Sequence, residues 1–131
     1  MIETNVTLPQ PEDANRAVNA AKRRFETFRD VSAEDRAEMM RRVASLIDGH
    51  CEEIAELESL DCGKPVSESV ADVETCRDLF RFYADMIPVQ DKMLPKEEDG
   101  MRSRIVHEPK GVVAMVTPWN YPLMQACVKV A

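Results

Sequence analysis

A continuous apolar run, Val112–Val116, constrains the fold of this chain more than any other part of its sequence. Its β-branched and small side chains predict a strand that is buried on both faces. Thr117-Pro118 ends this strand, and Pro122 suits the first turn of a helix, where its missing N–H group is not needed. No helix-breaking residue follows between Leu123 and Ala131. The segment 111–131 is therefore predicted to be a strand, a tight loop and a helix.

Trp119 and Asn120 lie in the predicted loop, at the carboxyl end of the predicted strand. Ligands bind at this end of the strands in open α/β sheets. A large aromatic side chain and a primary amide between two prolines are unusual if only a turn is required. The simpler alternatives are a rigid surface turn, or an Asn120 or Tyr121 that caps the following helix. The residues alone leave both interpretations open.

The composition excludes several classes of function. A length of 131 residues suits one domain, and 44% hydrophobic with 31% charged residues is typical of a globular protein. The formal charge of −7, without a basic cluster, argues against a nucleic-acid partner. No apolar run approaches membrane-spanning length, and the N-terminus lacks the features of a signal peptide. We therefore expect no membrane partner and a cytoplasmic location.

The cysteines and histidines do not predict a metal site. The four cysteines are too far apart for a CxxC unit, and the two histidines lie on separate predicted elements. Reduced thiols are expected, and packing is favoured over a reactive role for Cys127. The residues concerned are Cys51, Cys62, Cys76, Cys127, His50 and His107.

Apolar residues at three- and four-residue spacing predict four helices before this segment. Gly63 and Pro65 are placed to end the third of them, with Gly63 in a left-handed conformation. Whether Gly49 kinks one long helix or separates two is left open. The predicted helices cover about Glu12–Arg29, a stretch opened by the capping residue Ser32, a stretch from about Glu52, and Val66–Ile87, which Pro88 closes.

A hairpin is predicted between these helices and the last one. Val89–Gly100 contains a proline and an acidic run, and it is the best candidate for a linker. Met101–Val106 alternates polar and apolar residues, which predicts a strand, and Glu108–Gly111 turns it into Val112–Val116. The predicted fold class is α/β, with a helical N-terminal region leading into a β-hairpin and a first strand–loop–helix.

Two stretches carry a resemblance to a known family. EPKGVVAMVTPWNYPL, from Glu108 to Leu123, resembles the segment of the NAD(P)-dependent aldehyde dehydrogenase superfamily that holds its oxyanion-hole asparagine. ESLDCGKP, from Glu58 to Pro65, resembles a landmark after the early helices of that family, and it is interpreted as helix punctuation without a catalytic role. In the family a cysteine thiolate attacks the aldehyde, an asparagine amide and a backbone N–H hold the oxyanion, and hydride leaves for the nicotinamide.

The resemblance implies roles for individual residues of this chain. Asn120 matches the oxyanion-hole asparagine, and Lys129 matches a lysine close behind it on the next helix. The cofactor implied is NAD or NADP. Tyr121 is implied in substrate binding, as part of the aromatic box that betaine-aldehyde enzymes use for a quaternary ammonium, although Val128 and Gln125 depart from that type. The stretch that matches the nicotinamide end of the cofactor site is Val116, Thr117, Pro118 and Trp119.

The resemblance also implies a domain organisation. Residues 1–99 match the helical N-terminal part of the cofactor-binding domain, 100–110 an arm strand and turn used in subunit association, and 111–131 the first strand–loop–helix of a Rossmann-like core. A buried strand needs sheet neighbours, and no other stretch predicts one. The nucleophilic cysteine of the family lies far downstream of the asparagine. We therefore expect an incomplete dinucleotide-binding domain, and a chain that alone does not oxidise the aldehyde substrate of the intact enzyme.

Two further possibilities remain at this stage. The family is homo-oligomeric, so the chain could be a non-catalytic remnant that associates with intact subunits through Met101–Val106, or one that aggregates. It could instead be an acidic helical interaction module whose resemblance near its C-terminus is accidental.

Overall fold

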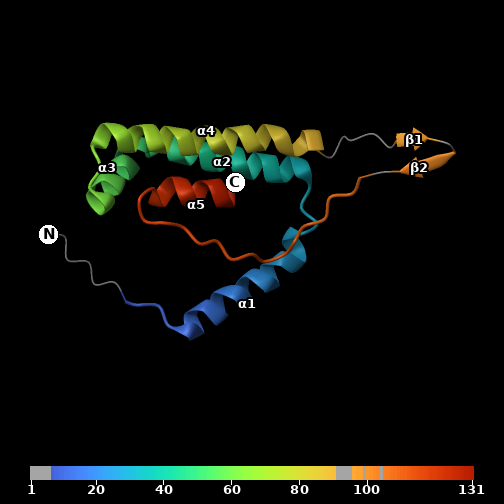
Figure 1. Cartoon of the computed structure of the whole chain (residues 1–131), viewed down its shortest axis with the longest axis horizontal. Coiled ribbons are helices and arrows are strands. Elements are labelled where there is room, and N and C mark those ends of the chain that lie inside the picture. The colour runs from blue at the N-terminus through green and yellow to red at the C-terminus, as the bar shows by residue number, and fades with distance from the viewer. Residues whose placement is uncertain (1–6, 91–95, 99, 104) are drawn as a thin grey trace. The chain divides into compact units, whose positions relative to one another are not determined.

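The computed structural model describes residues 7–90, 96–98, 100–103 and 105–131. These residues form five helices and two short strands (Figure 1). They separate into two units, the first made of the described residues up to Val31 with Glu108–Ala114, and the second of Ser32–His107 with Met115–Ala131. In chain order the elements are α1 (Pro11–Phe28), α2 (Ala33–Gly49), α3 (Cys51–Cys62), α4 (Val66–Gln90), β1 (Lys96–Glu98), β2 (Met101–Ser103) and α5 (Pro122–Val130).

The first unit is built on α1. The helix begins with Pro11 in its first turn, and the backbone N–H of Gln10 donates to Asp13 Oδ2 at 2.8 Å, which satisfies a group at the helix start. Gly111 has φ 96° and lies against the Phe25 ring, where an added Cβ would be 3.9 Å from the ring edge. The predicted first helix is therefore confirmed, but none of its residues is buried.

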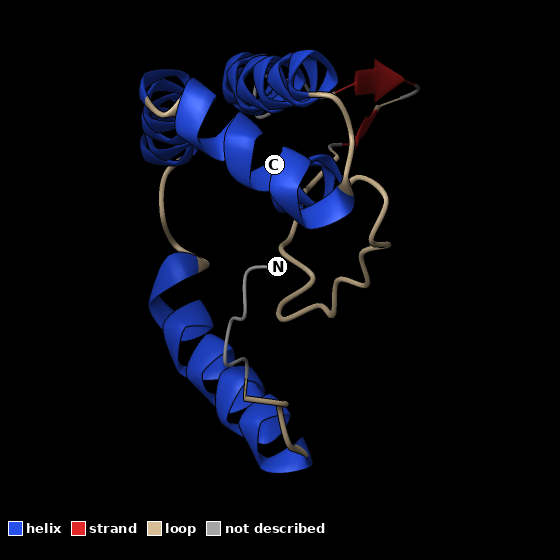
Figure 2. Ribbon diagram, turned by 90° about the vertical axis from the view of Figure 1, so that its left-hand side faces the viewer, coloured by secondary structure: helices blue, strands red, loops and turns tan. Residues whose placement is uncertain are grey.

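The prediction of an α/β fold is wrong, because the described chain is mainly helical. Residues 112–116 form no strand and are drawn as loop in Figure 2. The side chains of Val113 and Val116 are 58% and 84% exposed. A buried strand exists only where other strands accept its hydrogen bonds, and the described residues offer no such neighbour to this run. The Rossmann-like strand and the hairpin that was to precede it are therefore not formed.

The strand pairing that does occur involves other residues. β1 and β2 are antiparallel, with Glu97 opposite Arg102. Of the strand predicted over Met101–Val106, Met101–Ser103 forms a strand that pairs with Lys96–Glu98 in place of Val112–Val116, and residue 104 lies outside the described residues. Of the predicted linker, residues 91–95 and 99 lie outside the described residues.

The second unit packs α4 against α2, α3 and α5. Figures 1 and 2 show α5 lying beside the pair formed by α2 and α4. The core of the second unit is a cluster of buried side chains from α2, α4 and α5: Ala44 on α2, Cys76 and Phe80 on α4, and Cys127 on α5. Burial of Cys127 in this cluster fixes the middle of α5 on the α2–α4 pair. No helix among the described residues combines the length and apolarity needed to cross a membrane.

The helix ends follow the local sequence signals with one exception. Ser32 Oγ accepts a hydrogen bond from the Asp35 N–H at 3.0 Å, and Gly63 ends α3 with φ 77°. α2 ends at Gly49 and α3 begins at Cys51, so these are two helices. The exception is Pro88, which does not close α4; the helix continues to Gln90. Pro88 lacks the N–H for its own backbone hydrogen bond, but only two helical residues follow it, so little of the helix depends on that bond.

Candidate functional site

The loop predicted to carry the chemistry precedes α5 directly. Asn120 is exposed, and its side-chain amide makes no hydrogen bond to another residue that the structure describes. Tyr121 is the N-cap of α5, with no hydrogen bond from its side chain to the helix. Neither side chain therefore caps the helix, which removes one of the simpler explanations for an asparagine at this position. The amide of Asn120 is free to donate to a ligand.

A carboxylate from a helix that is distant in the sequence takes the place of the missing cap. Glu58 lies on α3 and is only 6% exposed, and its Oε2 accepts a hydrogen bond from the Leu123 N–H at 3.3 Å. Leu123 is the second residue of α5, so this N–H is one that the helix itself cannot satisfy. A negative charge at this end also complements the helix dipole. The start of α5 is thus held by α3.

Lys64 neutralises the buried carboxylate. Its Nζ lies 3.2 Å from Glu58 Oε1 and 2.6 Å from Asp72 Oδ2. The side chains of Lys64, Glu58 and Asp72 are 11%, 5% and 17% exposed. Burial lowers the pKa of Lys64, but the hydrogen bonds and charges of Asp72 and Glu58 outweigh it and raise this pKa above its ordinary value. The ammonium is therefore charged at neutral pH. We call these three residues the charged cluster.

The same ammonium contacts the loop. Lys64 Nζ lies over the ring of Tyr121, 4.3 Å from the ring centroid. This is a cation–π geometry, in which the negative face of the ring attracts the cation. The charged cluster therefore touches both Tyr121 and Leu123, the residues on either side of Pro122, and Asn120 comes immediately before them.

The turn between α3 and α4 places Lys64 in the cluster. Gly63 adopts a left-handed conformation that reverses the chain, and Ser59 Oγ donates to the Lys64 carbonyl oxygen at 2.6 Å. Pro65 follows, and its carbonyl accepts the Ser69 N–H in the first turn of α4. The GKP segment does punctuate the helices as predicted. It also delivers a charged side chain to the loop, which the sequence analysis did not predict.

Glu58 and Asp72 were likewise missed, although one signal was present. Glu58 follows Ile54 and Ala55 at helical spacing, so it falls on the apolar stripe of α3. A carboxylate on a buried face requires a partner, because an unpaired charge there is costly. That reasoning predicts a partner but not which residue provides it.

Among the described residues, no hydrogen bond joins Asn120 to any of the other predicted site residues. Lys129 is half-buried on α5, and its Nζ donates to Gln125 Oε1 at 3.0 Å on the same helix. Val116 and Trp119 are 84% and 79% exposed, and Thr117 and Pro118 are exposed as well. The loop therefore presents its backbone to solvent. The roles predicted for these residues stay predictions.

Two cysteines of the second unit are buried away from the loop that precedes α5. Cys76 and Cys127 are both buried in the core, and a hydrogen bond between them, together with burial, raises the pKa of the Cys76 thiol. The raised pKa keeps the Cys76 thiol protonated at neutral pH, whereas the hydrogen bond from Cys76 lowers the pKa of Cys127, which burial shields from solvent. Cys62 is half-buried and its Sγ donates to the Glu58 carbonyl oxygen at 2.9 Å.

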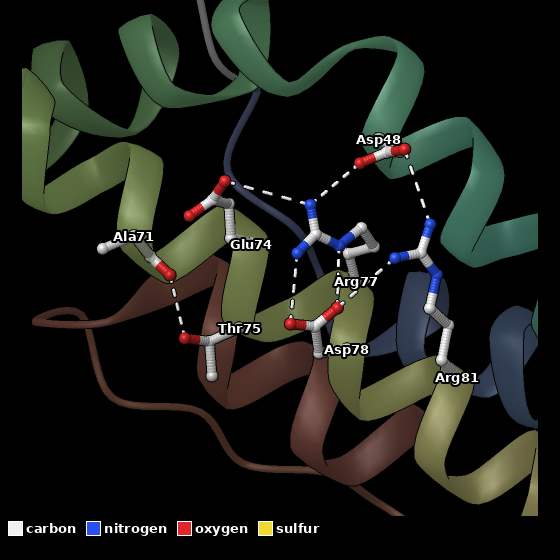
Figure 3. Close-up of polar contacts among 7 residues, drawn as sticks. All are labelled: Asp48, Ala71, Glu74, Thr75, Arg77, Asp78 and Arg81. Atoms are coloured by element: carbon white, nitrogen blue, oxygen red, sulfur yellow. Dashed lines mark hydrogen bonds and ion pairs between the residues drawn. The ribbon is translucent and has the colours of Figure 1, made fainter.

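A second group of charges joins α2 to α4 on the surface (Figure 3). Arg77 lies 2.9 Å from Asp48 Oδ1 at the end of α2 and 2.8 Å from its neighbour Asp78. Arg81 also reaches Asp48, at 3.5 Å. Hydrogen bonding to Arg77 holds the pKa of Asp78 below its usual range. Asp78 is 60% exposed, so this group is solvated, in contrast to the charged cluster.

Comparison with known proteins gives a family match over almost the whole chain. The model of the "Aldehyde dehydrogenase family" matches residues 3–131. Betaine aldehyde dehydrogenase of Bacillus subtilis is 39% identical over 123 residues, which cover 92% of this chain and 25% of that protein. A peroxisomal aminoaldehyde dehydrogenase of Pisum sativum is 40% identical over 129 residues, covering 92% of this chain and 26% of that protein.

Solved structures show the same relationship. The crystal structure of betaine aldehyde dehydrogenase from Staphylococcus aureus in complex with NAD+ matches with a TM-score of 0.80 and 42% identity. The match covers 92% of this chain and 24% of that one. This chain therefore spans about a quarter of the length of the relatives it matches.

Proposed function

We propose that this chain, which belongs to the aldehyde dehydrogenase family, supplies the oxyanion-binding loop of an enzyme that oxidises aldehydes to carboxylic acids. One observation carries the proposal. The family match covers residues 3–131, and within it Asn120 lies on an exposed loop, where its amide makes no hydrogen bond to another described residue. An asparagine that capped its own helix would not support this role.

The proposed chemistry assigns Asn120 one task. A cysteine thiolate of the complete enzyme attacks the aldehyde carbon, and the carbonyl oxygen becomes an oxyanion. The Asn120 side-chain NH₂ donates a hydrogen bond to this oxygen as its charge develops, which stabilises the transition state more than the bound aldehyde. Lys129, one helix turn beyond Gln125, is proposed to support the loop from behind.

The loop backbone before Asn120 is proposed to form part of the cofactor site. Val116, Thr117, Pro118 and Trp119 are exposed, so a flat ring can lie along them. NAD is the cofactor we propose, because the Staphylococcus aureus relative was solved with NAD+. When bound, NAD accepts the hydride that leaves the oxyanion intermediate. The chain's own residues contribute to positioning this cofactor.

The proposed substrate is an aldehyde that carries a cationic amine or ammonium group. Relatives are named betaine and aminoaldehyde dehydrogenases, and Tyr121 is 40% exposed beside Asn120. Its ring contacts the ammonium of Lys64 at 4.3 Å, and this contact supports a role of the ring in holding a cation. We propose that the ring also faces the cationic end of the substrate.

We propose that aldehyde oxidation requires further sequence beyond these residues. The relatives are about four times as long as the matched region, and Cys76 and Cys127 are buried in the core here. A cytoplasmic location and assembly into a homo-oligomer remain part of the proposal.

The test compares the chain with a chimera. The purified chain is mixed with NAD+ and betaine aldehyde or an ω-aminoaldehyde, and NADH absorbance is followed; we expect no increase over a control without protein. In the chimera, this chain replaces the matching quarter of the Bacillus subtilis relative. NADH formation by the folded chimera is the expected result. A folded, NAD-binding chimera without activity would contradict the proposal.

A further inference from the structure

The beginning and the middle of α5 are held by different contacts. Cys127 anchors the middle of the helix in the apolar core. At its beginning the Leu123 and Met124 side chains also pack against this core, and two polar contacts are added, the Leu123 N–H to Glu58 Oε2 at 3.3 Å and the Tyr121 ring to Lys64 Nζ at 4.3 Å. The polar contacts involve only the Leu123 N–H and the Tyr121 ring, so they can be lost while the apolar contacts of the helix remain. The loop can therefore lose its position while the helix keeps its place.

The polar contacts end at the residue next to Asn120. Tyr121 is the N-cap of α5 and has no cap hydrogen bond of its own, and Pro122 has no N–H to donate. The Leu123 N–H is then the first donor of the helix backbone, and it is taken by Glu58. The direction in which the chain leaves Asn120 is thus set by groups on α3 and on the turn after it.

From these contacts we infer that Glu58, Lys64 and Asp72 are positioning residues for Asn120, an inference that rests on the oxyanion role proposed for its amide. Glu58 fixes the first turn of α5, and Lys64 fixes the Tyr121 ring. Asp72 holds the Lys64 ammonium over the ring through its Oδ2, which lies 2.6 Å from Lys64 Nζ. None of the three side chains needs to touch the substrate. They act through the backbone of Tyr121 and Leu123.

The alternative is that the cluster only stabilises the fold. The two cases differ in where a variant acts. A purely structural ion pair stabilises the whole second unit, so its loss would change all protected amides of α5 together. A positioning cluster would release Tyr121–Leu123 first and leave Cys127 protected, because the apolar core is intact.

The experiment measures amide hydrogen exchange by NMR on the full chain, without any need for catalysis. K64M removes the charge but keeps most of the length of the side chain. We expect exchange at Leu123 to become about tenfold faster, while exchange at Cys127 changes less than about twofold. The side-chain amide signal of Asn120 should shift in K64M. K64R, which keeps a cation at this position, should retain most of the protection of Leu123.

R77M is the matched control. Arg77 is a cation on α4 that pairs with Asp48 and Asp78, away from the loop. R77M should leave unchanged the ratio of the exchange rate at Leu123 to that at Cys127. It should also leave the Asn120 side-chain signal unchanged. If K64M does not fold, Y121L provides the same test, because it removes the ring and leaves the charged cluster intact.

Two results would overturn the inference. One is equal acceleration at Leu123 and Cys127 in K64M or Y121L, which would make the cluster a general stabiliser. The other is no change at Leu123 and Asn120. These outcomes concern the loop alone, so they are separate from the activity of the chimera, which tests the role of Asn120 itself.

Discussion

The backbone nitrogen of Leu123 lies 3.3 Å from Oε2 of Glu58, although the two residues are 65 positions apart in the sequence. A helix that begins at Pro122 without a cap of its own is thereby completed by a carboxylate from α3. Because the buried carboxylate also needs a cation, Lys64 and Asp72 join the same cluster. The helix start, the ion cluster and the loop with Asn120 are therefore parts of one arrangement.

Replacing Glu58 by Ala should be strongly destabilising. The change leaves the Leu123 N–H without its acceptor and removes one of the two carboxylates around the buried Lys64 ammonium. We expect the free energy of unfolding to fall by roughly 2–3 kcal/mol, measured by urea titration with circular dichroism. E56A, at an exposed position of the same helix, is the control and should change it by less than about 0.5 kcal/mol. Equal effects of the two variants would contradict the buried pairing.

Ser69 provides a test in the opposite direction. Its hydroxyl is fully buried in α4, and it has no hydrogen-bond partner among the described residues. A buried polar atom without a partner is costly, so S69A should stabilise the chain by about 1 kcal/mol. The same urea titration measures this effect. S67A, at an exposed position in the first turn of α4, should have little effect. A loss of stability in S69A would show that the hydroxyl has a partner in solution.

Asp78 should give a pH dependence at acidic pH. The hydrogen bond from Arg77 is the main reason that the pKa of this carboxyl is lowered in the folded chain. Its contribution to stability is therefore present above the unfolded value of about 3.9 and is lost as the pH falls through the lower, folded pKa. NMR titration of the Asp78 carboxyl carbon should show the low pKa, and R77M should raise it toward the unfolded value, but not fully, because Arg81 also lowers this pKa. The same pKa in both proteins would contradict the contact shown in Figure 3.

The thiols should differ in reactivity. Cys76 and Cys127 are buried in the core, whereas Cys51 and Cys62 are half-buried. With an aromatic disulfide reagent at neutral pH, Cys51 and Cys62 should react in the folded chain. Cys76 and Cys127 should react only when urea unfolds it, as mass spectrometry of the labelled peptides would show. Rapid labelling of Cys127 in the native chain would mean that α5 leaves the core easily.

The helices could be predicted from sequence because their signals are local. The apolar spacing of α1, the Ser32 cap and the Gly63 turn each act within a few residues, and the structure has all of them. The strand predicted over Val112–Val116 is not formed, because its signal is not local in this sense. A strand depends on hydrogen bonds to other strands, and an apolar pattern cannot supply them. The same pattern is therefore compatible with the exposed loop that this chain forms.

Only part of the candidate site could be predicted from the sequence. Asn120 and Tyr121 stood out because a loop between two prolines carries them, and the family resemblance then gave the amide a role. The charged cluster combines residues from α3, the following turn and α4, and only the fold brings these three together. Its sequence signal was a single charge on the apolar stripe of α3, which indicates that a partner exists but does not identify it.

The most direct test of this account is the effect of N120A on kcat of the chimera with the Bacillus subtilis relative. N19A, at an exposed position of α1, is the matched control. Loss of one oxyanion donor lowers kcat by about 100- to 1,000-fold, with a much smaller change in the KM for the aldehyde. We predict this loss for N120A and less than about a twofold change for N19A. A kcat for N120A within about threefold of the parent chimera would contradict the oxyanion role of Asn120.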